Sequence, residues 1–250
     1  AWGIVGSVRC VSEAGPDTRL EDGDQSILGE VQQIITLPRF EKSDAEDVLE
    51  DKVESVELSD EVMSQLHNYV ATIAALYRDN PFHNFEHASH VTMSVVKLLS
   101  RIVAPSHIHI ENVAALDDKE TTRLASKLHD HTYGITSDPL TQFACVFAAL
   151  IHDVDHTGLP NTQLVKEKTA LASVYNDKSV AEQNSVDVAW ALLMDDSFSA
   201  IRRVIYSNGD ELKHFRLLVV NSVMATDIMD KDLKELRNSR WDRAFQESAT

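Results

Sequence analysis

The amino-acid sequence predicts an all-α fold, a compact bundle of several helices, and three observations support this prediction. Glycine (8) and proline (6) are scarce among the 250 residues, and so few turn-forming residues favour long helices over many short strands. Apolar residues recur at helical spacing through most of the chain after residue 59. No segment shows the strict alternation that indicates a half-buried strand.

The first 58 residues are expected to be an acidic, partly disordered N-terminal extension (1–58), followed by one folded domain (59–250). Residues 1–60 contain 15 acidic and 5 basic residues, and five of the eight glycines precede residue 30. Such a composition is typical of a solvated segment with little core. One short helix is predicted inside it, at residues 27–37.

The domain is predicted to begin with two long helices. The first follows Ser59 with an acidic first turn and ends before Asn80-Pro81. Its apolar stripe consists of Val62, Leu66, Tyr69, Val70, Ile73 and Tyr77. The second stops before Pro105, and its stripe consists of His87, Val91, Val95, Leu98 and Ile102.

The middle of the chain is predicted to be irregular until a strongly apolar helix begins. Residues 105–137 are polar, with one short helix expected at 119–128. Asp138 then precedes Pro139, an N-cap residue followed by proline at the first helical position. The apolar helix that they open runs directly into His152-Asp153, and residues 157–160 break it.

The last predicted helices start at polar caps. Ser179 and Glu182 have the spacing of a capping box ahead of a third apolar stripe. Asn208-Gly209 is expected to close a further helix, and Asp210 is expected to cap one that reaches about Asp227.

The overall composition excludes several classes of protein. A formal net charge of −17 opposes binding to nucleic acid or to an anionic membrane. Two cysteines cannot form a disulfide framework, and no apolar run approaches the roughly 18 residues of a membrane span. Because the sequence opens on Ala1 and its first methionine is Met63, we expect it to be part of a longer protein.

Nine of the eleven histidines lie between residues 83 and 156, and two of them form the first candidate site motif. His83 and His87 are four residues apart and therefore share one face of a helix. Taken alone, the pair fits a small polar site and an ordinary helix start, with one capping and one packing histidine, about equally well.

The second motif is His152-Asp153-Val154-Asp155-His156. Neighbouring residues of a helix point about 100° apart, so His152 and Asp153 can share one metal ion only near the helix end. Alternatively, Asp153 bridges two ions and His156 reaches the second through water. Imidazoles with a carboxylate suit zinc at one position and magnesium or manganese at a neighbour richer in oxygen ligands.

The third motif, Thr226-Asp227, follows an apolar helix and is weak by itself. Together, the three motifs place polar groups from separate helices on apolar faces, as metal sites inside helical bundles do. Hydrolysis of a phosphate ester is the reaction most natural for two metals held this way. A histidine that is not a ligand can protonate the departing oxygen, and His83 is the candidate because it lies one turn from His87.

In this order and spacing the motifs resemble those of the class I 3′,5′-cyclic nucleotide phosphodiesterases. The matching residues are His83-Asn84, His87-Ala88, His152-Asp153, His156, Gly158, Asn161, Tyr175-Asn176-Asp177, Ser179-Val180, Glu182 and Ala225-Thr226-Asp227. The similarity covers about residues 60–235. The long polar insertion at 105–137 is similar to domains of algae and other protists, some of them fused to receptor-type nucleotide cyclases.

The resemblance implies an all-α fold of the HD phosphodiesterase type and hydrolysis of cAMP, cGMP or both to 5′-monophosphates. It implies two divalent cofactors, zinc at the first site and magnesium or manganese at the second. His87, His152 and Asp153 are similar to the zinc ligands, with Asp153 also touching the second ion. His83 resembles the proton donor to the leaving 3′ oxygen. His156, Glu182 and Thr226 match positions that hold waters of the second metal.

The chain departs from the family pattern at its C-terminal end. The fourth metal ligand, an aspartate well downstream of Thr226-Asp227, has no counterpart, nor do the glutamine and aromatic residue that clamp the base. We therefore expect a C-terminally incomplete catalytic domain, in the cytoplasm or on the cytoplasmic side of a larger membrane protein. The alternatives are another HD-type metal phosphohydrolase, or a regulatory module that binds a partner or nucleotide without turnover.

Overall fold

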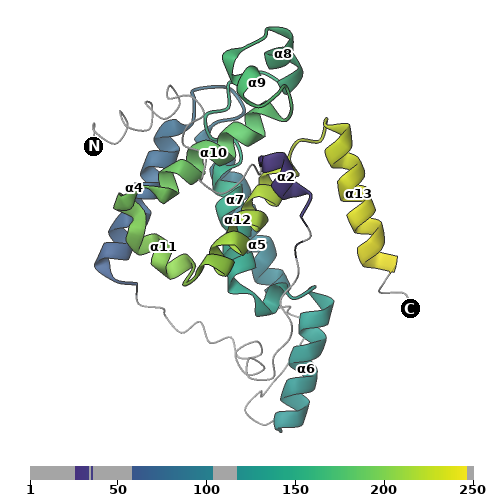
Figure 1. Ribbon diagram of the computed structural model, residues 1–250. Coiled ribbons are helices and arrows are strands. Elements are labelled where there is room, and N and C mark those ends of the chain that lie inside the picture. The colour runs from purple at the N-terminus through teal and green to yellow at the C-terminus, as the bar shows by residue number, and fades with distance from the viewer. Residues whose placement is uncertain (1–25, 34, 36–57, 104–116, 247–250) are drawn as a thin grey trace.

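The computed structural model describes residues 26–33, 35, 58–103 and 117–246, and every regular element within them is a helix (Figure 1). The all-α prediction is confirmed. The α-helices are α2 (Ile27–Val31), α4 (Asp60–Leu76), α5 (Phe85–Val103), α6 (Asp118–His131), α7 (Pro139–Ile151), α8 (Asn161–Lys166), α9 (Ala170–Val174), α10 (Val180–Met194), α11 (Ser199–Ile205), α12 (Gly209–Met224) and α13 (Lys231–Gln246). Two 3-10 turns, η3 (Ile135–Ser137) and η4 (Asp196–Phe198), precede α7 and α11.

Helix α7 lies in the middle of the bundle and packs against α5 and α12, the two most extensive helix contacts of the described residues (Figure 1). Its sequence is apolar on several faces, which suits a helix that is covered on more than one side. The core around it includes Phe147, Ile151, Val186, Leu193, Phe198, Phe215, Val219 and Val223. Because α7 ends at Ile151, the same packing holds the residues that follow it, His152 and Asp153.

Two buried tyrosines connect α4 to the rest of the bundle. The hydroxyl of Tyr69 donates to the carbonyl of Ala189 on α10 at 2.9 Å, and that of Tyr77 donates to the carbonyl of Leu150 on α7 at 2.8 Å. A buried tyrosine hydroxyl needs such a partner. These bonds bring the loop after α4, which carries His83, to the C-terminal end of α7.

The predicted starts of α4 and α7 are confirmed. Ser59 accepts a hydrogen bond from the amide of Val62 at 3.3 Å, and Asp138 accepts one from the amide of Leu140 at 3.1 Å. Pro139 occupies the first helical position. The helix expected at 119–128 is present and longer, at Asp118–His131.

Two predicted caps are wrong. Ser179 precedes α10 in a left-handed conformation (φ 38°) and makes no side-chain cap, because its hydroxyl donates instead to Asp227 Oδ2 at 2.7 Å. Helix α12 begins one residue before Asp210, and its cap is Asn208, which accepts a hydrogen bond from the amide of Glu211 at 2.9 Å. Asn208-Gly209 therefore opens α12 and does not close the preceding helix, which ends at Ile205. The helix expected at 27–37 is shorter, at Ile27–Val31.

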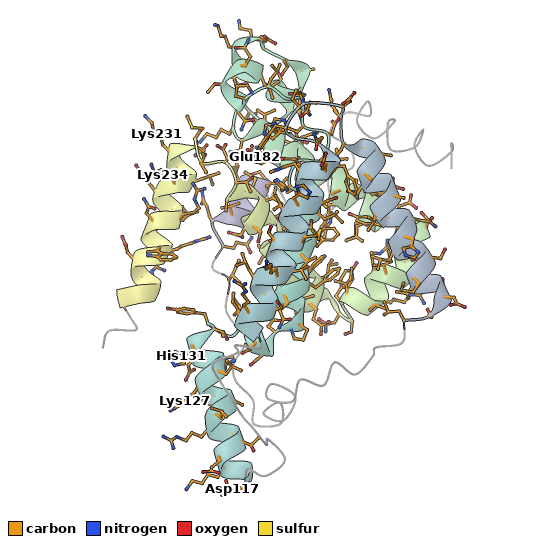
Figure 2. The ribbon with its side chains drawn as sticks, turned by 180° about the vertical axis from the view of Figure 1, so that it is seen from behind. Asp117, Lys127, His131, Glu182, Lys231 and Lys234 are labelled. Atoms are coloured by element: carbon orange, nitrogen blue, oxygen red, sulfur yellow. The ribbon has the colours of Figure 1, made fainter. Side chains whose placement is uncertain are left out.

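Most of the predicted extension 1–58 lies outside the described residues. Within it, α2 packs against α12, and Glu30 forms a buried ion pair with Arg216 at 2.9 Å. At the opposite end of the domain from Glu182, helix α6 projects away from the bundle (Figure 2). Of the helices that the structure describes, none has the length and apolar character needed to cross a bilayer.

Replacing Phe215 with alanine is expected to destabilise the domain by about 3–5 kcal/mol. Phe215 is fully buried, and its ring lies 5.4 Å from that of Phe147 and 5.8 Å from that of Trp190, so truncation leaves a cavity between α7, α10 and α12. Urea denaturation followed by far-UV circular dichroism measures the change. Val204→Ala, at a side chain 55% exposed, is the control, and equal effects of the two substitutions would contradict this account of the core.

Candidate metal centre

His87 is placed by the start of α5. Its backbone amide donates to Asn84 Oδ1 at 3.0 Å, which caps the first turn of the helix. Ala88, the next residue, is fully buried in the core of the bundle. The pKa of His87 is lowered, first by burial and then by the neighbouring His152. A neutral imidazole is the form that binds a metal ion.

His152 and Asp153 lie just past the last residue of α7, as the sequence requires if both are to reach one ion. His152 Nδ1 lies 2.9 Å from the carbonyl oxygen of Ala149. Because a carbonyl only accepts, Nδ1 carries the proton and Nε2 is left to bind a metal ion. Burial alone would lower the pKa of His152, but the hydrogen bond and charge of Asp153 raise it. Burial likewise opposes the charge on Asp153, yet His152 holds the pKa of that carboxyl below its ordinary value.

The donor atoms of His87, His152 and Asp153 fit one metal ion. Asp153 Oδ2 lies 3.1 Å from His152 Nε2 and 3.7 Å from His87 Nε2, and all three ligand atoms lie within 4.8 Å of one another. Two ligands bound tetrahedrally at about 2.1 Å are about 3.4 Å apart, between the two measured distances. The three side chains predicted as metal ligands are therefore brought together.

His83 and His156 form the other side of the same centre. Their rings stack with centroids 3.8 Å apart and planes 20° from parallel, and with Asp153 they form a second group whose ligand atoms lie within 4.8 Å. The amide of Gly158 donates to His156 Nδ1 at 2.9 Å, so a neutral His156 carries its proton on Nε2. Burial, and then the charge of His83, lower the pKa of His156. Asp153 belongs to both groups.

Glu182 lies in a polar network beside this centre. Its Oε2 accepts a hydrogen bond from Asn161 Nδ2 at 2.8 Å, and the same nitrogen lies 3.3 Å from Asp227 Oδ2. Burial raises the pKa of Glu182, the bond from Asn161 opposes this shift, and the charges of Asp227 and Asp153 add to it. A carboxylate placed beside the candidate ligands in this way can hold a water next to a metal ion.

Thr226 is not joined to the cluster by its side chain. It is exposed, and its hydroxyl donates to the carbonyl of Val223 at 2.7 Å, while the next residue, Asp227, is buried in the network with Asn161 and Ser179. The structure therefore joins Asp227, more directly than Thr226, to Glu182.

Sequence reasoning missed several residues that support the centre. Asp155 has a left-handed backbone (φ 60°), and its carboxylate accepts hydrogen bonds from Arg78 Nε at 2.7 Å and from Asn184 Nδ2 at 3.1 Å. Asn80 donates to the carbonyls of both His83 and His156. In the sequence, Asp155 lies inside the His152–His156 motif and Asn80 precedes Pro81. Neither position indicates the residues, distant in the sequence, with which these side chains form hydrogen bonds.

Comparisons with known proteins identify the family of this chain. A family model described as 3'5'-cyclic nucleotide phosphodiesterase matches residues 82–240. The cGMP-inhibited 3',5'-cyclic phosphodiesterase 3A of Homo sapiens is 32% identical over 178 residues, which are 64% of this chain and 15% of that protein. The probable 3',5'-cyclic-AMP phosphodiesterase pde-4 of Caenorhabditis elegans is 31% identical over 166 residues, 66% of this chain and 20% of that protein. This chain thus spans a fifth or less of the length of these two relatives.

A solved structure supports the fold. The phosphodiesterase domain of the RhoPDE fusion protein from the choanoflagellate Salpingoeca rosetta superposes with a TM-score of 0.51 and 23% sequence identity. The match covers 75% of this chain and 48% of that one. At this level of identity the likeness concerns the all-helical architecture alone.

Proposed function

This chain belongs to the 3'5'-cyclic nucleotide phosphodiesterase family, and we propose on that premise that it hydrolyses 3′,5′-cyclic nucleotides, cAMP, cGMP or both, to 5′-nucleoside monophosphates. The observation that carries the proposal is the convergence of four histidines on one aspartate. Two groups of three side chains able to hold an ion share Asp153, so one carboxylate would serve two neighbouring ions of the kind used in phosphate hydrolysis. The catalytic domain of the proposal is residues 59–250.

The family implies dependence on divalent metal ions, and we assign the ions by the chemistry of the donor atoms. His87 Nε2, His152 Nε2 and one oxygen of Asp153 suit zinc, because imidazole nitrogen and carboxylate oxygen are its common ligands. Asp153, with waters held by His156 and Glu182, would suit magnesium or manganese at the second position, whereas the family's water-holding role for Thr226 would need its hydroxyl to leave the carbonyl of Val223. When bound, such ions supply positive charge to the phosphoryl oxygens and lower the pKa of water.

The protein side chains position the substrate phosphate and move a proton. His83 faces the centre from the loop before α5, and its ring stacks on that of His156. In the proposed reaction, the oxygen of a water bonds to phosphorus as the bond from phosphorus to the 3′ oxygen breaks, and the water gives up one proton to solvent. Protonated His83 then donates its proton to that 3′ oxygen, which leaves as a hydroxyl, and general acid catalysis of this kind contributes about 10²–10⁴-fold.

We place the domain on the cytoplasmic side, in a larger protein that also carries a receptor or nucleotide-cyclase region. The motifs are similar to those of protist phosphodiesterases with such fusions. One structural relative is the phosphodiesterase domain of a fusion protein. Nucleic acid is an unfavourable partner because the formal net charge is −17.

Removing the metal ions is expected to abolish hydrolysis. With the full chain loaded with zinc and magnesium, cAMP or cGMP is converted to the 5′-monophosphate, and a strong chelator lowers the rate by about 10³-fold or more. Chromatography of the nucleotides before and after adding back each metal measures the loss and its recovery.

A panel of substrates separates the proposal from its two alternatives. Hydrolysis of nucleoside monophosphates with cAMP and cGMP untouched would indicate another HD-type phosphohydrolase. Binding of cyclic nucleotide without turnover, at full metal occupancy, would indicate a regulatory module. Either result contradicts the proposed activity.

A further inference from the structure

Asn80 bridges two segments of the candidate centre that are far apart in the sequence. It lies in the loop between α4 and α5 and is half-buried. Its amide nitrogen Nδ2 donates to the carbonyl of His83 at 2.9 Å and to the carbonyl of His156, 76 residues away, at 3.2 Å. An amide nitrogen has two hydrogens, so a single side chain satisfies both carbonyls.

The other polar atoms of Asn80 fix the conformation of its own loop. Its Oδ1 accepts a hydrogen bond from the amide of Phe82 at 3.3 Å, and its carbonyl accepts one from Asn84 Nδ2 at 3.0 Å. Asn84 in turn caps the turn that carries His87. Asn80 and Asn84 together therefore connect the backbone of His83 to that of His87.

Asn80 also lies close to the loop that carries His156 and Gly158. Gly158 has φ 83°, and a Cβ atom added to it would lie 3.6 Å from Asn80 Cβ. The nearby Arg78–Asp155 ion pair, at 2.7 Å, joins the end of α4 to the same loop but does not reach His83. Of the hydrogen bonds described, those of Asn80 join the backbone of His83 to that of His156.

We propose that Asn80 is a positioning residue, which holds His83 against His156 so that the His83 ring faces the leaving oxygen. The two hydrogen bonds from Asn80 Nδ2 keep the rings of His83 and His156 stacked, with their centroids 3.8 Å apart. A displacement of about 1 Å at a reacting group costs about 10²-fold in rate. The kinetic part of this inference rests on the proposed phosphodiesterase activity, whereas the geometric part does not.

Two variants test the donor role, with one control, all made in the full chain. Asn80→Ala removes the side chain beyond Cβ. Asn80→Asp keeps its shape and its acceptor but cannot donate to a carbonyl. The control is Asn238→Ala, at an exposed asparagine on α13.

The first measurement is independent of metal and activity. In metal-free protein, histidine ring signals are recorded by NMR. In both Asn80 variants the signals of His83 and His156 are expected to shift together, because the rings separate. The ring signals of His129 and His214 are expected to keep their chemical shifts. His129 contacts Ser137 and not Asn80. Unchanged His83 and His156 signals in Asn80→Asp would overturn the proposal.

The second measurement compares leaving groups in metal-loaded protein. For a cyclic nucleotide, both variants are expected to lower kcat about 10–100-fold and to leave KM and zinc content unchanged. For bis(p-nitrophenyl) phosphate, whose leaving group needs no proton, kcat is expected to change less than about threefold, since general acid catalysis is not required. An equal loss on both substrates, or Asn80→Asp behaving as wild type, would overturn the proposal. If wild type hydrolyses no cyclic nucleotide, the proposed activity fails, while the NMR result still decides the role of Asn80.

Discussion

Replacing Asp153 with asparagine is expected to lower kcat on a cyclic nucleotide by about 10³-fold or more. Asp153 belongs to both groups of candidate ligands, so its loss affects both ions at once. A bound metal ion contributes several kcal/mol to the stabilisation of developing charge, and each 1.36 kcal/mol corresponds to a tenfold change in rate. The neutral amide keeps the shape of the side chain but not its charge.

The same substitution is expected to lower the metal content of the purified protein. Asp153 Oδ2 is the atom that lies near both His152 Nε2, at 3.1 Å, and His87 Nε2, at 3.7 Å. Without it, two neutral imidazoles remain on one side of the centre. Elemental analysis for zinc and magnesium, alongside steady-state kinetics, measures both effects.

The matched control is Asp196→Asn, at an exposed aspartate of η4. It is expected to retain metal and activity within about twofold, as surface substitutions have small effects. If Asp153→Asn keeps full metal occupancy and a rate within tenfold of wild type, the shared ligand is not Asp153, and the assignment of the centre is wrong.

Local signals in the sequence predict much of the fold. Ser59 and the Asp138-Pro139 pair are found at helix starts because a cap depends on residues within one turn. His152 and Asp153 are found at a helix end because an apolar run stops there and Gly158, with φ 83°, follows. The candidate ligands His152 and Asp153 could be located from the sequence for the same reason.

Helical periodicity predicts a helix but not what covers it. The predicted apolar stripe of α5 runs from His87 to Ile102, yet Leu98 is 58% exposed and Ile102 is 37% exposed. Helix α13 was not predicted, because its sequence is largely charged and offers few apolar residues. Arg240 attaches it to the domain through Asn221 and through the carbonyl of Val31, 209 residues away.

Long-range hydrogen bonds explain the errors at the site. Ser179 has the sequence context of a helix cap, whose oxygen would accept a hydrogen bond from a backbone amide. Its hydroxyl instead points to the carboxylate of Asp227, 48 residues further along the chain, and donates to it. Asn80 has the context of a helix break before proline, yet its amide joins two loops of the centre. A hydroxyl or amide side chain can form hydrogen bonds with nearby backbone groups or with groups that the tertiary fold brings close. The sequence around the residue does not indicate which of these it forms.

Replacing His83 with glutamine is expected to lower kcat on a cyclic nucleotide by about 10²–10⁴-fold, the usual contribution of a general acid. Glutamine keeps a polar side chain of similar reach but has no proton to give. For bis(p-nitrophenyl) phosphate, whose leaving group departs without a proton, the loss is expected to be less than about tenfold, because no general acid is needed. Steady-state kinetics on the two substrates gives the ratio, and His67→Gln, at an exposed histidine of α4, is the control.

Metal content decides between two roles for His83. The histidine lies with Asp153 and His156 in a group able to hold an ion, so its geometry alone fits a ligand as well as an acid. An acid is expected to leave zinc and magnesium bound when it is replaced, and to lose rate only where the leaving oxygen needs a proton. A ligand is expected to lose an ion and to slow both substrates alike. We expect the first pattern, because His87, His152 and Asp153 supply three protein ligands without His83, and three is the number typical of a catalytic zinc site.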